Sequence, residues 1–278
     1  MTFSRSIVGL LVLFACVLSP GVSQGAPKAD LWPRWAAHDP ASVVRVDHGA
    51  WDRFLKDHVV GSEDGVNRVD YAAVGASDTD ALRAYLGMLS GIAVGTLNRG
   101  EQLAYWINLY NALTVRVILD HYPVSSIRKI NISPGFFSSG PWGKKLVTVE
   151  GEKLSLDDIE HRILRPVWQD PRIHYAVNCA SIGCPNLLPR AFAAEDLESL
   201  LDKAARDYIN HPRGARIEGG RLYVSSIYEW FKADFGGTDQ GVIDHLRTFA
   251  APGLSDQLTG LSAIADDDYD WSLNGVKP

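Results

Sequence analysis

Leu-Ala-Tyr-Trp-Ile-Asn-Leu-Tyr-Asn-Ala-Leu-Thr-Val-Arg-Val-Ile-Leu, residues 103–119, is apolar on nearly every side of a helix. Asn98 followed by Glu101 forms a capping-box signal before this run, and Pro123 follows it, so we predict one helix from Arg99 to His121. A helix without a polar face is expected to lie inside a domain. We therefore expect this helix to be the central buried strut of the fold.

Two polar side chains interrupt the apolar run. Asn108 and Asn111 are three residues apart, so they share a face of the helix. A buried amide without hydrogen-bond partners costs about 1–3 kcal/mol. We expect the pair either to bond the backbone of a loop or to line a functional site and orient another polar group there.

Hydrophobic periodicity and helix-start signals predict further helices on both sides of the strut. They cover residues 49–60, 78–92, 155–165 and 194–209, begin again at Ser226, and include the stretch around 242–249. Two hairpins are expected, at 146–154 and 216–225, because Glu-Gly and Gly-Gly form their turns. The sequence thus predicts a single α+β domain, mostly helical around a small antiparallel sheet of hairpins.

Two stretches lack regular periodicity. Residues 124–145 are rich in glycine, proline and aromatic residues, which is typical of a lid, a binding loop or a flap over the core. Asp266–Asp268 lie in an acidic stretch without the glycine and distal glutamate of an EF-hand loop. We expect these aspartates to form a solvated turn before a packed Tyr269 and Trp271.

The N-terminus has the pattern of a secretory signal peptide. Arg5 precedes an apolar run from Ile7 to Leu18, which is shorter than the roughly 20 residues that span a bilayer. We expect residues 1–25 to be the signal peptide, 26–48 an arm that packs through its tryptophans, and 49–278 one domain. The protein would then be periplasmic or secreted, with no later transmembrane segment. A lipid anchor at Cys16 is the less favoured alternative.

Composition narrows the partners. The formal net charge is −6 and the basic residues are scattered, so nucleic acid is not an expected partner. Removal of the signal peptide leaves Cys179 and Cys184, which an oxidising compartment favours joining as a disulfide. No cofactor is expected.

Both cysteines lie in Arg-Ile-His-Tyr-Ala-Val-Asn-Cys-Ala-Ser-Ile-Gly-Cys-Pro, residues 172–185. Its first half alternates, which predicts a strand with His174 and Asn178 on its polar face. Its second half is small and turn-like. Cys179 lies where strand and turn meet, so it is the residue best placed to carry chemistry.

The helix at 155–165 has unusually complete start signals. Ser155 is the expected N-cap, Asp158 its capping-box partner, and Pro166 is expected just past the end. Glu160 and His161 lie away from the apolar face. They form either a solvated charged face or a pair of side chains that reach the Cys179 turn.

Five motifs occur in order along the chain, at 104–113, 154–165, 172–185, 224–231 and 269–274. Together they resemble the domain-of-unknown-function 547 family, over about residues 49–274. The resemblance implies no particular activity, but it places emphasis on a set of polar residues and cysteines. These are Asn108, Asn111, Glu160, His161, His174, Asn178, Cys179, Cys184, Asp270 and Asn274.

One functional hypothesis is an exported binding or scaffold domain with a Cys179–Cys184 disulfide. Its partner would be a peptide, a protein or a component of the cell envelope. In this hypothesis the asparagines brace loops, and the long aromatic loop holds the partner.

The alternative is a thiol hydrolase or transferase acting on amide or ester bonds. Cys179 would be the nucleophile, with His161 or His174 as base and Glu160, Asn178 or Asp270 orienting the base. Backbone amides of residues 180–183 would stabilise an oxyanion. The remaining site-lining residues would be Asn108, Asn111 and Asn274.

A third hypothesis is a metal site built from His161, His174, Cys179 and Cys184. Their spacings match no common zinc motif. Thiol–disulfide exchange is expected least, because the two-residue spacing of the usual redox pair is absent.

Overall fold

Helix α3, Arg99–His121, lies inside the molecule over its predicted bounds. The computed structural model describes residues 27–135 and 139–276, so the predicted signal peptide and Cys16 lie outside the described residues. The Asn98 side chain caps α3 by accepting a hydrogen bond from the Glu101 backbone N–H. Within the described part of the chain, no helix is both long enough and apolar enough to span a bilayer.

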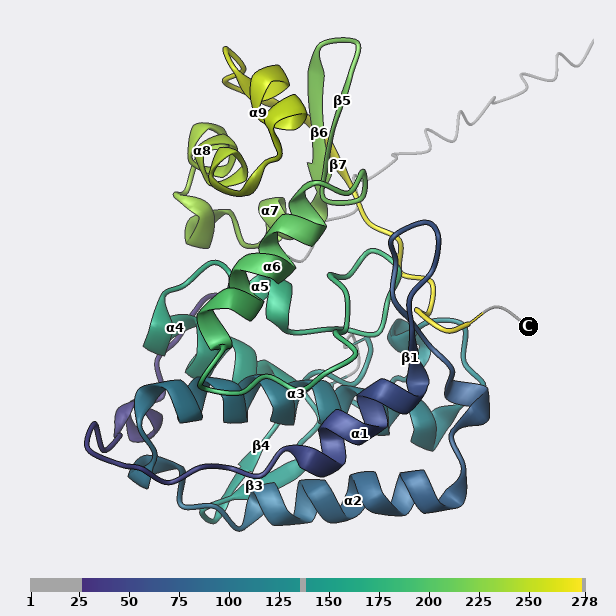
Figure 1. The fold of residues 1–278 in the computed structure, drawn as a ribbon, viewed down its shortest axis with the longest axis vertical. Helices are drawn as coiled ribbons and strands as arrows, with labels where there is room; N and C mark the ends of the chain where they lie inside the picture. Colours follow the sequence, from purple (N-terminus) through teal and green to yellow (C-terminus); the bar gives the residue numbers. More distant parts are fainter. Residues whose placement is uncertain (1–26, 136–138, 277–278) are drawn as a thin grey trace, which may run out of the picture.

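The helices around α3 form the lower part of the molecule in Figure 1. Helix α2, Ala76–Ser90, packs against α3, and α1, Gly49–His58, packs against α2. The predicted hairpin is present as β3, Val147–Val149, and β4, Glu152–Leu154. A second short antiparallel pair joins β1, Val59–Val60, to β2, Arg68–Val69.

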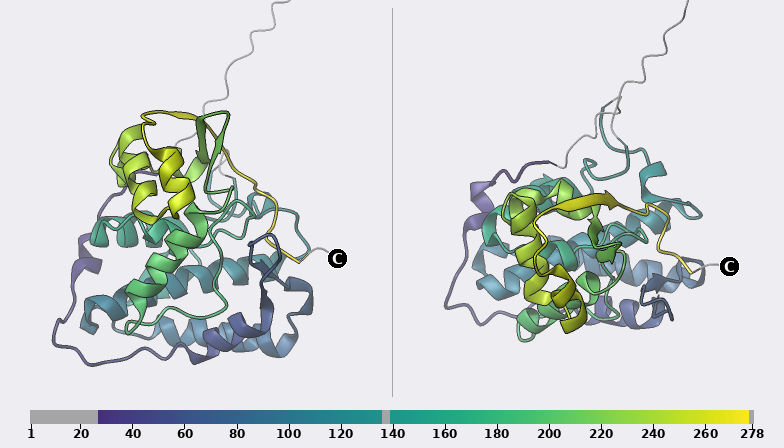
Figure 2. Two further views of the ribbon diagram at one scale, coloured as in Figure 1. Left: turned by 45° about the horizontal axis from the view of Figure 1, so that its top comes forward. Right: turned by 90° about the horizontal axis from the view of Figure 1, so that it is seen from above.

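Helix α6, Leu197–Ile209, joins two hydrophobic cores. Its first turns bury leucines against the core around α3, and its last turns bury Tyr208 and Ile209 in a second core. The second core is closed by α8, Asp239–Phe249, and α9, Pro252–Leu258. The left view of Figure 2 shows α6 between α3 and the α8–α9 pair.

A three-stranded sheet lies beside this second core (Figure 1). The predicted hairpin is β5, Ala215–Glu218, with β6, Arg221–Ser225. Strand β7, Ile264–Asp268, pairs with β6 in parallel. The prediction of a solvated acidic turn was therefore wrong. The aspartates form an edge strand, where Arg216 binds Asp268 at 2.7 Å.

The predicted strand at 172–178 was also wrong. Residues Ile173–Ala176 form a one-turn helix, α5, and the Val177 N–H bonds the Ile173 carbonyl. Every residue from 173 to 178 is buried, so the alternation of residue types does not reflect an exposed and a buried face. The α+β class and the single domain are confirmed, with three small sheets in place of one.

The arm after residue 26 packs onto the domain through tryptophan, as predicted. Trp35 is buried in the first core, and its ring centre lies 5.1 Å from that of Trp106. Trp32 packs at the edge of the same core, under the guanidinium of Arg162 at 4.5 Å.

Candidate functional site

Asparagines from the central helix fix the Cys179 turn. Asn111 of α3 donates to the Ala176 carbonyl and accepts from the Asn178 N–H, at 2.9 and 2.8 Å. Asn178 in turn donates to the Pro185 carbonyl and accepts from the Ala180 N–H. The Asn178 bond helps hold Ala180 at a φ of 58°, a left-handed conformation that is rare for alanine. The turn is therefore tightly determined from the core side.

Asn108 braces a different segment. Its amide makes two hydrogen bonds to the backbone of Phe192, in the loop before α6. Both asparagines of α3 thus form hydrogen bonds with the backbone of other segments, which was the first of the two expectations for this pair. Only Asn111 lies next to Cys179.

The C-terminal segment completes the turn from the opposite side. Ile182 and Gly183 donate to the carbonyls of Ser272 and Asp270, and Asn274 donates to Ala180. Gly183 has no room for a side chain, since an added Cβ would lie 2.8 Å from the Asp270 nitrogen. This close approach places the Tyr269 hydroxyl at Cys179.

The two sulfurs lie side by side in unequal surroundings. Cys179 Sγ is 2.9 Å from Cys184 Sγ, and both are free thiols. Cys179 is half-buried, whereas Cys184 is buried and accepts a hydrogen bond from the Cys179 N–H. The Tyr269 hydroxyl and Ser181 Oγ lie 3.0 and 3.2 Å from Cys179 Sγ.

These contacts separate the acidities of the two thiols. Burial opposes a thiolate at Cys179, but hydrogen bonds from Cys184, Ser181 and Tyr269 outweigh it and lower the pKa of Cys179. Burial, together with the adjacent Cys179, raises the pKa of Cys184 well above its ordinary value. Cys179, the less buried of the two residues, is therefore the more easily ionised one.

Three of the four amides predicted to stabilise an oxyanion are engaged within the protein. The N–H groups of Ala180, Ile182 and Gly183 each already donate to an oxygen atom of the protein. Stabilising an oxyanion requires free, convergent donors. These three amides are therefore occupied by structural hydrogen bonds.

Glu160 and His161 lie on a π-helix, Asp158–Leu164, which runs without a break into α4, Arg165–Trp168. Pro166 therefore lies inside the helix, contrary to the prediction. Proline has no N–H, so it cannot serve the carbonyl of His161 five residues earlier. The Asp30 N–H of the N-terminal arm bonds this carbonyl instead, at 2.9 Å.

The two histidines belong to a buried charged cluster. His174 Nε2 binds Asp234 at 2.7 Å, and Arg165 binds the same carboxylate at 2.6 Å. Despite burial, these two partners hold the pKa of Asp234 well below its usual range. Glu160 accepts from the Tyr110 hydroxyl, and its other oxygen lies 3.8 Å from His174 and 3.9 Å from His161.

Neither histidine is hydrogen-bonded to Cys179. Among the described residues, the hydrogen-bond partners of Cys179 Sγ are Ser181, Cys184 and Tyr269. His161 Nδ1 accepts from Arg165, so its proton in the neutral form is on Nε2, facing Asp157 at 3.7 Å. Burial lowers the pKa of His161, which favours this neutral form.

Asp157 is a carboxylate with a raised pKa beside the cluster. Burial, with the nearby charges of Glu160 and Asp158, raises its pKa to about 6. Lys145 opposes this effect. The Asp157 N–H bonds the Trp142 carbonyl, which ties the cluster to the long loop.

Four aromatic side chains pack against one another beside the Cys179 turn, which Tyr269 contacts, and we call them the aromatic surface: Trp142, Trp230, Tyr269 and Trp271. They come from three segments far apart in the sequence, and each is half-buried. Their ring centres follow one another at 4.7 to 5.7 Å. Trp230 ends α7, Ser226–Trp230. The next residue, Phe231, stacks on His174 at 4.3 Å, so two adjacent residues connect the aromatic surface to the charged cluster.

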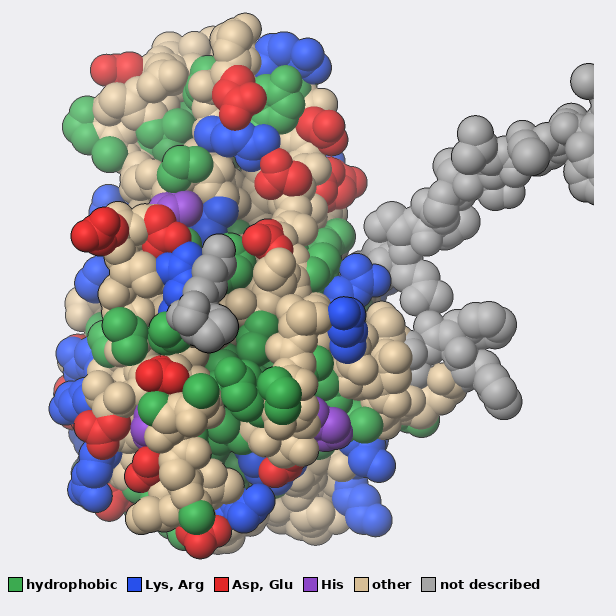
Figure 3. Space-filling model, turned by 90° about the vertical axis from the view of Figure 1, so that its right-hand side faces the viewer, with side chains coloured by type: hydrophobic (Ala, Val, Ile, Leu, Met, Phe, Trp, Pro, Cys, Tyr) green, Lys and Arg blue, Asp and Glu red, His purple; other side chains and the backbone are tan. Residues whose placement is uncertain are grey.

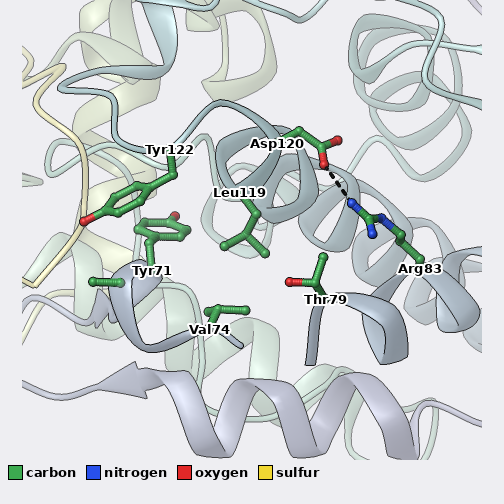
Figure 4. A pocket seen from close by; sticks show the side chains of 8 residues that line it. Tyr71, Val74, Thr79, Arg83, Leu119, Asp120 and Tyr122 are labelled. Carbon is green, nitrogen blue, oxygen red and sulfur yellow. Dashed lines mark ion pairs between the residues drawn. The ribbon is translucent and has the colours of Figure 1, made fainter. Parts of the chain in front are cut away.

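A pocket in the described part of the chain lies elsewhere. It has a volume of about 540 Å³ between α2 and α3, with Tyr71 and Tyr122 at one end and the Arg83–Asp120 ion pair at the other (Figure 4). The Tyr71 hydroxyl donates a hydrogen bond to Asn274, so this pocket borders the far side of the site.

On the face in Figure 3, hydrophobic side chains gather in a central patch among charged ones.

Within residues 27–135 and 139–276, no three or more His, Cys, Asp or Glu side chains are arranged so that they could hold a metal ion. His161 and His174 lie with carboxylates, and the cysteines lie with hydroxyls. The proposed metal site of two histidines and two cysteines is therefore not assembled.

Residues 94–209 match a family model described as protein of unknown function, DUF547. This part of the chain is similar to the DUF547 family. The match includes α3, the π-helix, both cysteines and α6. No curated protein and no solved structure matches the chain. The match ends before Tyr269 and Asn274, so the site is completed by residues outside the matched range.

The structure gathers most of the predicted site residues. Asn111, Asn178, Cys179, Cys184 and Asn274 meet at the turn, while Glu160, His161 and His174 form the adjacent charged cluster. Asp270 contributes its backbone carbonyl, which accepts from the Gly183 N–H, while its exposed carboxylate accepts from the Ser272 N–H. Sequence reasoning missed Ser181, Asp234 and the hydroxyl of Tyr269. The recurrence of Tyr269 in a family motif was the available signal for it.

Proposed function

We propose that this protein is an exported binding domain whose ligand site is the aromatic surface beside Cys179. Within it, a disulfide between Cys179 and Cys184 fixes the turn. The ligand is a peptide or a cell-envelope component that presents apolar or flat ring groups. The aromatic surface supports this proposal most directly, because its four half-buried rings come from three segments and aromatic rings bind ligands by stacking and burial.

The disulfide rests on a separate observation. The sulfurs already lie 2.9 Å apart in a turn that is braced from both sides. A disulfide bond is about 2.05 Å long, so closure needs a movement of only about 1 Å. An oxidising compartment supplies the condition for it.

Tryptophan fluorescence offers a direct test of binding, because three of the four residues of the aromatic surface are tryptophans. Synthetic peptides with and without aromatic residues, and soluble envelope glycans, would be titrated into the protein. We expect a saturable change with members of one panel, and at least a tenfold weaker affinity for Trp271→Ala.

Trp168→Ala is the matched control. Both tryptophans are half-buried and carry an arginine over the ring, at 5.2 Å for Trp271 and 5.5 Å for Trp168. Equal loss of affinity in the two variants, or no saturable binding in either panel, would contradict the proposal.

A thiol hydrolase is the second candidate, and the lowered pKa of Cys179 favours it. Among the described residues no histidine is hydrogen-bonded to Cys179 as a base, and the amides of Ala180, Ile182 and Gly183 already donate within the protein. Its test is a covalent acyl adduct on Cys179 after incubation with an activated ester, measured by intact mass. Absence of that adduct at a thiol that alkylates readily would reject this candidate.

A further inference from the structure

We infer that Cys179 and Cys184 form a redox-active pair that exchanges disulfides with cysteine-containing peptides, in place of a permanent crosslink. This inference rests on the disulfide of the proposed function and adds an activity to it. Four residues separate the two cysteines in place of the two of a usual redox pair, so the geometry of the folded turn carries this inference.

The first observation is the unequal burial of the two cysteine residues. Cys179 is half-buried, while Cys184 is only 4% exposed. A substrate sulfur therefore reaches Cys179 first. Cys184 is held behind it at 2.9 Å, where it can attack Cys179 but not a bulky substrate. A redox pair divides the attacking and resolving roles in this way.

The second observation is the set of donors around Cys179. The Tyr269 hydroxyl is 3.0 Å from the sulfur and itself accepts from Ser181 at 3.0 Å. Burial raises the pKa of Tyr269 well above its ordinary value, so it remains a proton donor. A donor fixed on the sulfur stabilises the thiolate both as the attacking group and as the leaving group.

The third observation is the position of the aromatic surface. Tyr269 contacts Cys179 through its hydroxyl and packs its ring against Trp230 and Trp271, at 4.8 and 4.7 Å. A peptide laid on these rings would present a cysteine to Cys179. The aromatic surface therefore supplies the substrate contact that a bare dithiol lacks.

The exchange balances in two steps. The Cys179 thiolate attacks one sulfur of a peptide disulfide, a new S–S bond forms, and the other peptide sulfur leaves as a thiolate. The Cys184 sulfur then attacks Cys179, the first peptide sulfur leaves, and the Cys184 proton passes to the departing thiolates or to solvent. The peptide gains two electrons and the cysteine pair loses two; the reverse sequence oxidises a peptide dithiol.

The test is a redox equilibrium in the whole protein. Purified wild type would be equilibrated in buffers of reduced and oxidised glutathione, quenched in acid, denatured, alkylated and weighed. We expect a reversible transition between two free thiols and one disulfide within the glutathione range. We also expect Cys184→Ser to accumulate a glutathione adduct on Cys179, and Cys179→Ser to accumulate at least tenfold less.

The outcomes separate the two proposals. A disulfide that forms but is reduced by glutathione only after denaturation would keep the crosslink and overturn the exchange. Two free thiols under every condition would overturn both. Equal adducts in the two single variants would contradict the division of roles.

Tyr269→Phe tests the donor separately, with Tyr122→Phe as control, because Tyr122 is 39% exposed, lines the pocket of Figure 4 and is not among the hydrogen-bond partners of Cys179. In reduced protein, the pH midpoint of Cys179 alkylation should rise by about one unit in Tyr269→Phe, the effect of losing one hydrogen bond to a charged sulfur. It should stay unchanged in Tyr122→Phe. Equal midpoints in the two variants would contradict the role of Tyr269.

Discussion

Gly183 is the residue at which the Cys179 turn and the C-terminal segment come closest. Its N–H bonds the Asp270 carbonyl at 2.8 Å, and a Cβ would lie 2.8 to 3.0 Å from the Asp270 backbone and the Tyr269 ring. We expect Gly183→Ala to destabilise the fold by about 1–3 kcal/mol through overpacking, lowering Tm by about 2–10 °C.

Gly87→Ala is the control for this substitution. Gly87 lies in α2 with no atom within 4 Å of an added Cβ. Alanine there should stabilise the protein by up to about 1 kcal/mol. Thermal melts of the two variants measure both effects, and a Gly183→Ala protein as stable as wild type would contradict the packing described.

Asp157 gives the site a pH dependence. Its pKa in the folded protein is raised to about 6 from the ordinary value of 3.8, so folding favours the protonated carboxyl. This contribution to stability is present at low pH and is lost as pH rises from about 4 to about 6. Asp157→Asn should remove the loss, so its Tm advantage over wild type should grow across that range and then level off.

The size of this advantage is limited by solvent. The Asp157 side chain is 39% exposed, so we expect less than about 1 kcal/mol, or about 3 °C in Tm. Asp57→Asn, at an exposed position on α1, should follow the pH curve of wild type. A Tm difference for Asp157→Asn that does not vary with pH would show that this carboxylate is not the titrating group.

Single residues were predictable where one local rule applied. Asn98 caps α3 because its side chain satisfies a free N–H, which is a local event. The role of Tyr269 depends on a contact with Cys179, 90 residues away in the chain. The sequence therefore identified the cysteines and asparagines of the site, but not the hydroxyls that surround the sulfur.

At the scale of elements, the N-terminal arm acts as a partner for the π-helix. The N–H groups of Asp30 and Trp32 donate to the carbonyls of His161 and Arg162, and Arg165 donates to the Pro27 carbonyl. Asp30→Pro removes one of these N–H groups and leaves the His161 carbonyl unpaired. We expect a cost of about 1–3 kcal/mol, seen as a lower denaturant midpoint.

Asp30→Ala separates the backbone from the side chain. It keeps the N–H and loses only an exposed ion pair with Arg162 at 3.7 Å. Exposed ion pairs contribute about 0–1 kcal/mol, so this variant should resemble wild type. Equal destabilisation by the two substitutions would mean that the hydrogen bond to His161 is not what holds the arm.

Elements were predictable where pattern and environment agreed. Helix α3 is apolar all round, capped at its start and buried, so its predicted and observed bounds coincide. Helix α5 has only four residues and no exposed side, so its alternating sequence indicated a strand that does not form. The π-helix carries no local signal beyond Pro166, and its stability depends on the distant arm.

At the scale of the whole molecule, the site lies where distant parts of the chain meet. The matched DUF547 range supplies the cysteines, the asparagines and the π-helix. Residues beyond it supply Trp230, Asp234, Tyr269 and Asn274. The class and most helices followed from local pattern, whereas the parallel pairing of β7 and the closure of the turn depend on long-range contacts.

The most direct measurement is the redox state of the two cysteines in protein isolated from the exported fraction. The sample would be quenched in acid, denatured with an alkylating reagent so that burial protects neither sulfur, and weighed with and without prior reduction. We predict no alkylation without reductant and two added groups after reduction, as required by a Cys179–Cys184 disulfide. Two added groups without reductant would contradict the account.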